Sequence, residues 1–272
     1  MITTVFWSCT GMDGSSLSFQ TAQLISETEK TLIVELPCLG IPRLGFVCGI
    51  SDPDNNTEAA ISYFEQHAGI PWDMLYMQKK HLAVLAANIY AVPDYPLASK
   101  IGINTLMSFI SMFVHAAENN EYDRLIFECQ GQLNSPMTFF SLKEANEIVI
   151  PLGKPTEAAY AIASVNRLVR VYKHQAEMVI FAANGNRKMI ERAVMSRQEE
   201  GEAIQNWTVS AWNGRKITGL LLRKQKERVY IQKEGIREPD TLEEKDGMET
   251  WVYQASEMAT NNSRRNELSV NL

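Results

Sequence analysis

The first loop of the chain carries residue types suited to phosphate binding. It spans residues 8–18 and reads SCTGMDGSSLS, between an apolar run that predicts a strand and a stretch that predicts a helix. Phosphate-binding loops use glycines to turn backbone N–H groups toward the phosphates, a lysine to reach the terminal phosphate, and a Ser or Thr hydroxyl to hold Mg²⁺. Gly11 and Gly14 supply glycines, but the loop contains no lysine. The loop therefore keeps only part of this set.

Acidic and amide residues stand at the ends of three later apolar runs. Glu35 and Glu128 each close such a run, and Asn184 follows another. Ligands of open parallel sheets bind beyond the carboxyl ends of the strands, so the loop after the first strand is where a ligand site is expected. The two carboxylates could cap helices or pair with arginine, and Asn184 could belong to an Asn-Gly turn.

The elements that must position these residues follow from the hydrophobic pattern. We predict strands at Thr3–Trp7, Thr31–Leu36, Leu82–Ala86, Arg124–Glu128, Glu147–Leu152, Met178–Ala183 and Ile217–Leu222. We predict helices at Ser16–Glu29, Ile103–Ala117, Glu157–Tyr172, Arg187–Arg197 and Thr250–Met258. This alternation predicts an α/β fold with a doubly wound, mostly parallel sheet and helices on both faces.

The pattern gives one domain over residues 1–260, followed by a polar C-terminal tail at 261–272. The fold of the segments Ser51–Lys80 and Gln198–Trp212 is the least certain part of this prediction. No basic leader precedes the first strand, and no apolar run approaches the roughly 20 residues of a membrane-spanning helix. We therefore expect a cytoplasmic protein without a transmembrane segment.

The composition excludes several classes of function. The 272 residues include 26 Lys/Arg and 32 Asp/Glu, a net charge of −6, so no general positive field attracts nucleic acid or anionic lipid. The charge is uneven: residues 1–136 hold 6 basic and 14 acidic residues, a net −8, and residues 137–272 hold 20 and 18, a net +2. The four cysteines and four histidines have no metal-ligand or disulfide spacing.

The loop and the strand ends together resemble the MinD/ParA family of deviant P-loop ATPases, whose loop reads Lys-Gly-Gly-x-Gly-Lys-Thr. In that frame the two glycines that match are Gly11 and Gly14, the leading lysine falls on Thr10, the second glycine on Met12, the phosphate lysine on Ser15 and the magnesium-binding threonine on Ser16. Both lysines are missing. The similarity of motif positions spans about residues 2–260.

The later motifs extend the resemblance. Glu35 and Glu128 stand where the family has its two acidic strand ends, Phe139–Asn146 where it has a short helix, and Asn184 where an Asn contacts the adenine base. The resemblance thus implies a degenerate nucleotide site at Gly11, Gly14, Ser15, Ser16 and Asn184. If ATP or ADP binds with Mg²⁺, the resemblance implies Ser16, Glu35 and Glu128 as the residues facing the metal.

The substitutions weaken the chemistry of such a site. The family's lysines neutralise charge on the phosphoryl oxygens in the transition state, which Thr10 and Ser15 cannot do. Asp13 adds a carboxylate to the same loop. Three interpretations remain open: a tight turn with no ligand, nucleotide binding without hydrolysis, and ATP hydrolysis. We expect a pseudo-ATPase with no catalytic residue and no cofactor, unless nucleotide binding is retained.

The leading functional hypothesis is a degenerate MinD/ParA-like protein that acts as a positioning or assembly adaptor for a pilus, secretion or conjugation machine, similar to the atypical TadZ/CpaE-like proteins. One alternative is an active ATPase of the partition or site-selection type with ATP-dependent dimerisation. Another is a small-molecule enzyme with Glu35 and Glu128 as acid and base.

The resemblance also implies a homodimer with protein partners. We expect no nucleic-acid partner, because Glu227 interrupts the basic run Arg223–Arg228 and acidic residues follow it, as on a solvated surface. The C-terminal residues form no amphipathic membrane helix, so recruitment to a membrane complex would depend on protein partners.

Overall fold

The strands of the protein form one mixed sheet. A computed structural model describes residues 1–37, 41–50, 52, 54–89, 101–172, 176–185, 187–198, 206–223 and 253–254. Within these residues the strand order is β3-β4-β2-β5-β1-β6-β7-β8-β9. The strands are β1 (Ile2–Ser8), β2 (Thr31–Glu35), β3 (Tyr76–Lys79), β4 (Leu82–Leu85), β5 (Arg124–Gln130), β6 (Glu147–Leu152), β7 (Met178–Ala183), β8 (Asn206–Ala211) and β9 (Tyr253–Gln254). Only the outer pairs β3·β4 and β8·β9 are antiparallel.

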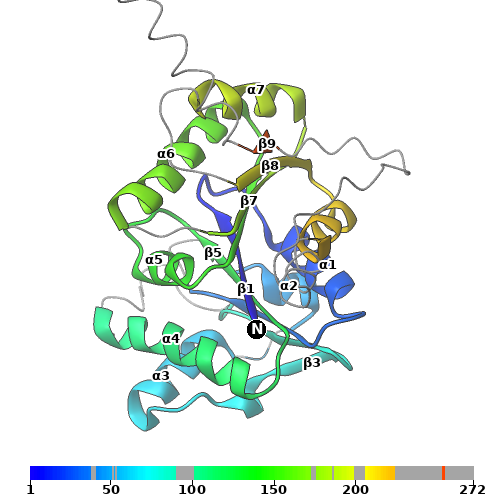
Figure 1. The fold of residues 1–272 in the computed structure, drawn as a ribbon. Coiled ribbons are helices and arrows are strands. Elements are labelled where there is room, and N and C mark those ends of the chain that lie inside the picture. The colour runs from blue at the N-terminus through cyan, green and yellow to red at the C-terminus, as the bar shows by residue number, and fades with distance from the viewer. Residues whose placement is uncertain are drawn as a thin grey trace, which may run out of the picture.

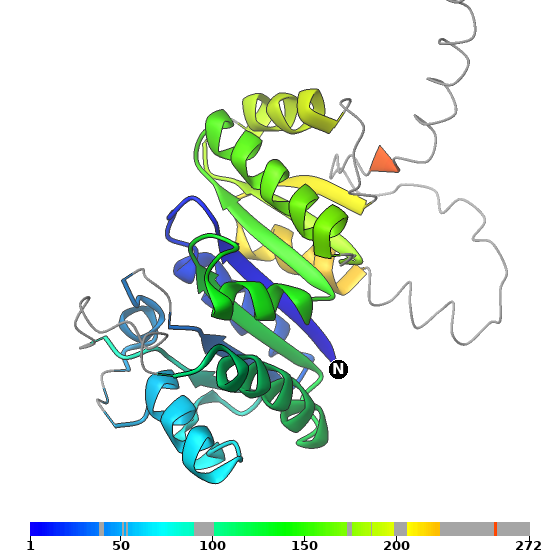
Figure 2. The same cartoon turned by 90° about the vertical axis from the view of Figure 1, so that its left-hand side faces the viewer.

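Helices cover both faces of this sheet. They are α1 (Ser15–Ile25), α2 (Leu44–Cys48), α3 (Thr57–His67), α4 (Ile103–Asn119), α5 (Pro136–Lys143), α6 (Pro155–Tyr172), α7 (Arg187–Gln198), the 3₁₀ helix η1 (Trp72–Met74) and a helical segment at 214–223. Figures 1 and 2 show α3 to α7 on one face and α1, α2 and the segment 214–223 on the other. The prediction of a doubly wound, mostly parallel sheet is confirmed.

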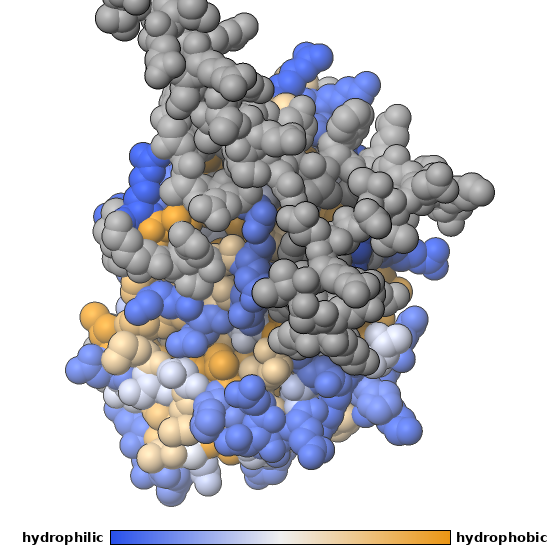
Figure 3. Space-filling model, in the orientation of Figure 1, coloured by the Kyte–Doolittle hydropathy of each residue, from blue (hydrophilic) through white to orange (hydrophobic). Residues whose placement is uncertain are grey.

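Two hydrophobic cores hold the layers together. On one face, α4 packs Phe109 and Phe113 against the sheet, and the ring of Phe113 lies 6.3 Å from that of Phe127 in β5. On the other face, α1 buries Leu17 and Ile25 fully. The central strands are buried on both sides, which explains why they read as continuous apolar runs. In the view of Figure 3, the described surface carries many hydrophilic side chains with apolar areas between them.

The prediction of a strand at Ile217–Leu222 is wrong, because residues 214–223 are helical. The Asn213 side chain caps this helix: its Oδ1 accepts the N–H groups of Arg215 (3.0 Å) and Lys216 (3.3 Å). Ile217, Leu220 and Leu221 follow at helical spacing and are buried in the core shared with α1. The short apolar run therefore marks one face of a helix.

The C-terminal prediction of a helix at Thr250–Met258 is also wrong for its described part, since Tyr253 and Gln254 form β9 beside β8. The rest of that range and the tail at 261–272 lie outside the described residues. The uncertain segment Ser51–Lys80 contributes α3, η1 and β3, and Gln198–Trp212 contributes β8. In the described part of the chain, none of the helices has the length and hydropathy needed to cross a lipid bilayer.

Candidate functional site

The predicted site residues gather at the carboxyl edge of the sheet. β1 lies between β5 and β6, and β2 pairs with β5 on its other side, so the ends of these strands adjoin. Glu35 of β2 and Glu128 of β5 are register partners and point to the same face, the one that α1 and α2 cover. The loop from β1 to α1 passes over this edge. The structure therefore brings these two strand ends and the loop together at one edge of the sheet.

The two glycines of the loop have different structural roles. Gly11 has φ +78°, a left-handed conformation that favours glycine, and its N–H donates to the carbonyl of Ser8 (3.2 Å). Gly14 is the N-cap residue of α1 and is buried. A Cβ atom at Gly14 would lie 2.8 Å from Ser8 Oγ and 3.1 Å from Pro151 Cγ. Gly11 is thus needed for the turn and Gly14 for close packing.

Ser15 is buried and turns both of its donors toward carboxylates of the protein. Its hydroxyl donates to Glu128 Oε1, and its backbone N–H donates to Asp13 Oδ1 (3.0 Å). One turn further along α1, the hydroxyl of Ser18 donates to Glu128 Oε2 (2.6 Å). Ser16 is exposed, so the hydroxyl that faces the acidic strand end is that of Ser15.

Glu35 holds the chain segments beside this loop. Its Oε1 accepts the backbone N–H groups of Arg43 (2.7 Å) and Leu44 (3.2 Å) at the start of α2, and its Oε2 accepts that of Ala87 after β4 (3.1 Å). Both oxygens of Glu35 and both of Glu128 therefore accept hydrogen bonds from the protein itself. Glu35 therefore caps the amino end of α2, as in the helix-capping alternative, and it also holds the segment that follows β4.

Burial changes the acidity of the carboxyl pair. The pKa of Glu128 is raised to about 8, mainly by loss of solvation and also by the nearby carboxyl of Glu35, although the Ser15 and Ser18 hydroxyls lower it. The pKa of Glu35 is raised to about 7, mainly by loss of solvation, although three backbone N–H groups lower it. At neutral pH the two carboxyls are therefore partly protonated, whereas exposed glutamates would be ionised.

Met12 and Gly153 join the loop to the turn after β6. A Cβ atom at Gly153 would lie 2.1 Å from Met12 Cε, so the methionine side chain occupies the space that only glycine leaves open. A Cβ at Gly185, which follows Asn184, would in turn lie 3.8 Å from the carbonyl oxygen of Gly153. Asn184 is exposed, and its N–H donates to the carbonyl of Leu152 (2.7 Å). It therefore stands at the same edge as the loop.

These residues do not fit a magnesium nucleotide. The loop supplies no lysine, and the oxygens of Glu35 and Glu128 are already hydrogen-bonded. Asp13 would repel an incoming phosphate: two unit charges about 4 Å apart interact by roughly 4 kcal/mol at an effective dielectric constant of 20. Across the described residues, His, Cys, Asp and Glu nowhere gather in a group of three that could hold a metal ion.

Two residues of the site, Ser18 and Arg43, were not predicted from the sequence. Ser18 shares Glu128 with Ser15, and its spacing of three residues on one helix face was a usable signal. Arg43 approaches the loop, with Nη1 lying 3.7 Å from Asp13 Oδ1. That contact joins segments far apart in sequence, so no local sequence pattern predicts it.

Comparison with solved structures identifies the fold. A ParA family ATPase from Chlorobium tepidum superposes with a TM-score of 0.54 at 13% identity, covering 85% of this chain and 93% of its own. A plasmid partition protein from Borrelia burgdorferi gives 0.59 at 13%, covering 82% and 100%. A chain of the MinC–MinD cell division complex from Aquifex aeolicus gives 0.55 at 13%, covering 88% and 99%. No protein-family model and no curated protein matches the sequence.

The sheet order and the loop before α1 define a doubly wound α/β fold of the P-loop NTPase type. Within that class, the chain has the fold of the MinD and ParA ATPases. The similarity extends over most of each compared chain.

Proposed function

We propose that this protein is a catalytically degenerate MinD/ParA-like protein, a positioning or assembly adaptor that does not hydrolyse ATP. The observation that carries the proposal is the hydrogen bonding of Ser15. This residue stands where the family's loop has its phosphate lysine, and it gives its hydroxyl to Glu128 and its N–H to Asp13. Donors that a nucleotide would need are thus taken by carboxylates of the chain.

The same contacts supply what a bound nucleotide supplies in an active site, a fixed loop geometry. Met12 against Gly153, and Glu35 with the start of α2, hold the neighbouring segments without a ligand. We therefore propose a homodimer that forms without nucleotide. Ile41 and Phe46 are 66% and 65% exposed near the start of α2 and give the same edge apolar surface for a protein partner.

The kind of partner follows from the TadZ/CpaE-like analogy, which favours a component of a pilus, secretion or conjugation machine. The protein would locate such a component in the cell and would itself reach a membrane complex through protein contacts. This part of the proposal is tested by the genes beside its own, which should encode such machinery.

ATP turnover tests the proposal directly. Purified protein with Mg-ATP should release phosphate at the rate of a buffer blank, and sedimentation should give the same oligomeric state with and without nucleotide. Ser16→Ala is the matched variant, because Ser16 is exposed and its loss should leave the fold intact. Turnover above the blank that disappears in Ser16→Ala would establish the alternative, an active ATPase of the partition or site-selection type.

A further inference from the structure

The loop before α1 contains an anion of its own. Asp13 Oδ1 accepts the N–H of Ser15 in the first turn of α1, at 3.0 Å. The amino end of a helix carries a partial positive charge, and phosphates bind there for that reason. The Asp13 carboxylate therefore takes one of the donors that an external anion would use.

The same carboxylate faces a cation from another segment. Arg43 precedes α2, and its Nη1 lies 3.7 Å from Asp13 Oδ1. This nitrogen is buried and has no hydrogen-bond partner among the described residues, so Asp13 is the acidic group that its charge meets. The two side chains are 29% and 47% exposed, which leaves their attraction only partly screened by water.

Arg43 is also fixed at its backbone. Its N–H donates to Glu35 Oε1 at 2.7 Å, and the next residue, Leu44, donates to the same oxygen. A continuous chain of polar contacts thus runs from the amino end of α1 through Asp13 and Arg43 to Glu35 at the end of β2.

We propose that Asp13 is a built-in substitute for a ligand phosphate, which ties the loop before α1 to α2 through Arg43 and so fixes α2 without nucleotide. This inference rests on the proposed function and adds its regulation: α2 is held in place whether or not nucleotide is present. Removing the carboxylate should loosen α2, which Glu35 still holds at its amino end, and leave a place for an external anion between Arg43 and the amino end of α1.

Hydrogen exchange followed by mass spectrometry tests this tether. In Asp13→Ala and in the near-isosteric Asp13→Asn, exchange in a peptide covering 41–48 should rise about two- to fivefold, the range for losing a half-exposed ion pair. Arg43→Gln should raise exchange over residues 9–18. Asp73→Ala removes an exposed carboxylate in η1 and should change neither peptide.

Inorganic phosphate supplies the second arm of the experiment. It should restore slow exchange at 41–48 in Asp13→Ala, but have no effect on the wild type or on the Asp13→Ala/Arg43→Gln double variant. Unchanged exchange at 41–48 in both Asp13 variants would overturn the tether, as would equal protection of the wild type by phosphate. The proposed function fails by a different result, ATP turnover by the wild type, so the two failures are distinguishable.

Discussion

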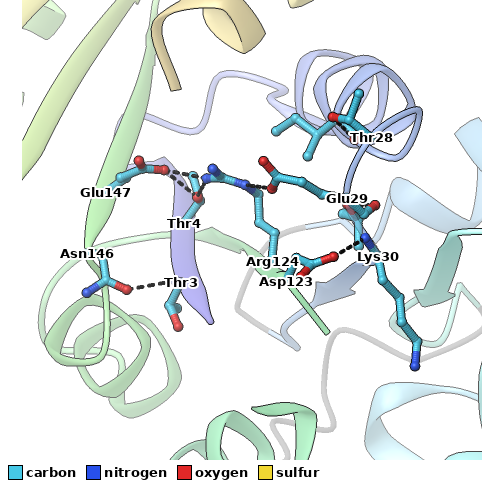
Figure 4. Close-up of polar contacts among 11 residues, drawn as sticks. Thr3, Thr4, Thr28, Glu29, Lys30, Asp123, Arg124, Asn146 and Glu147 are labelled. Carbon is cyan, nitrogen blue, oxygen red and sulfur yellow. Dashed lines mark hydrogen bonds and ion pairs between the residues drawn. The ribbon is translucent and has the colours of Figure 1, made fainter. Parts of the chain in front are cut away.

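Arg124 is a buried cation at the start of β5, shown in Figure 4, and its replacement should destabilise the fold strongly. Its side chain is fully buried. Its Nη1 donates to Glu147 Oε2 at 2.5 Å and to Thr4 Oγ at 2.7 Å, and its Nε donates to Glu29 Oε2 at 3.0 Å. With Glu128 bound to Ser15 at the other end of β5, these contacts hold both ends of the α1 segment.

Arg124→Met is the informative substitution, because it keeps an unbranched side chain and removes the charge. Glu29 and Glu147 would then be buried carboxylates without their cation. Breaking a buried ion pair in this way costs about 3–5 kcal/mol of unfolding free energy. For a domain of this size the melting temperature should fall by about 6–20 °C.

Urea unfolding monitored by circular dichroism measures this loss. The matched control is Arg167→Met in α6, where an exposed arginine is replaced and the change should stay within about 0.5 kcal/mol. Adding Glu147→Gln to Arg124→Met removes one of the stranded charges. The double variant should therefore be more stable than Arg124→Met alone.

A loss below about 1 kcal/mol for Arg124→Met would refute this reasoning, since it would place the arginine in the range of a surface ion pair. The reasoning would also be contradicted if the stability losses of Arg124→Met and Glu147→Gln simply added in the double variant, because residues in one network should couple.

Three further predictions concern the site. Gly14→Ala should lower the unfolding free energy by about 1–3 kcal/mol in urea titrations, because the new methyl group meets Ser8 Oγ at 2.8 Å; no loss would contradict the packing. Gly153→Ala should cost less, about 0.5–1.5 kcal/mol, because its methyl group meets only the flexible end of Met12. Met12→Ala should relieve much of that loss in the double variant; additive losses would show that the two do not touch. Because the folded pKa of Glu128 is raised to about 8, its contribution to stability is complete below pH 4.5 and is lost as pH rises to 8. Glu128→Gln should flatten this decline in unfolding experiments from pH 5 to 8, and an unchanged slope would argue against the buried proton.

The sheet was largely predictable from the sequence because its central strands are buried on both faces. Runs such as Glu147–Leu152 and Met178–Ala183 read as strands for that reason, and both predictions are confirmed at their residue limits. The run at Ile217–Leu222 was wrongly predicted as a strand because a short apolar run of this length suits either element. The cap at Asn213 and the packing against α1 favour the helix.

The site was predictable in position but not in its contacts. The strand ends at Glu35 and Glu128 and the glycine loop are local signals, and a parallel sheet brings them to one edge. Which partner each carboxylate takes depends on approach distances across the fold. The choice of Ser15 over Ser16 as the residue facing Glu128 follows from where α1 begins, because a shift of one residue there turns the side chains by about 100° around the helix axis.

A calorimetric titration of the wild-type protein with Mg-ATP tests the central claim most directly. With the donors of Ser15 bound to Glu128 and Asp13, the account predicts no saturable heat up to about 1 mM nucleotide. Saturable binding in the micromolar range would contradict it and would assign the protein to the nucleotide-dependent members of its fold.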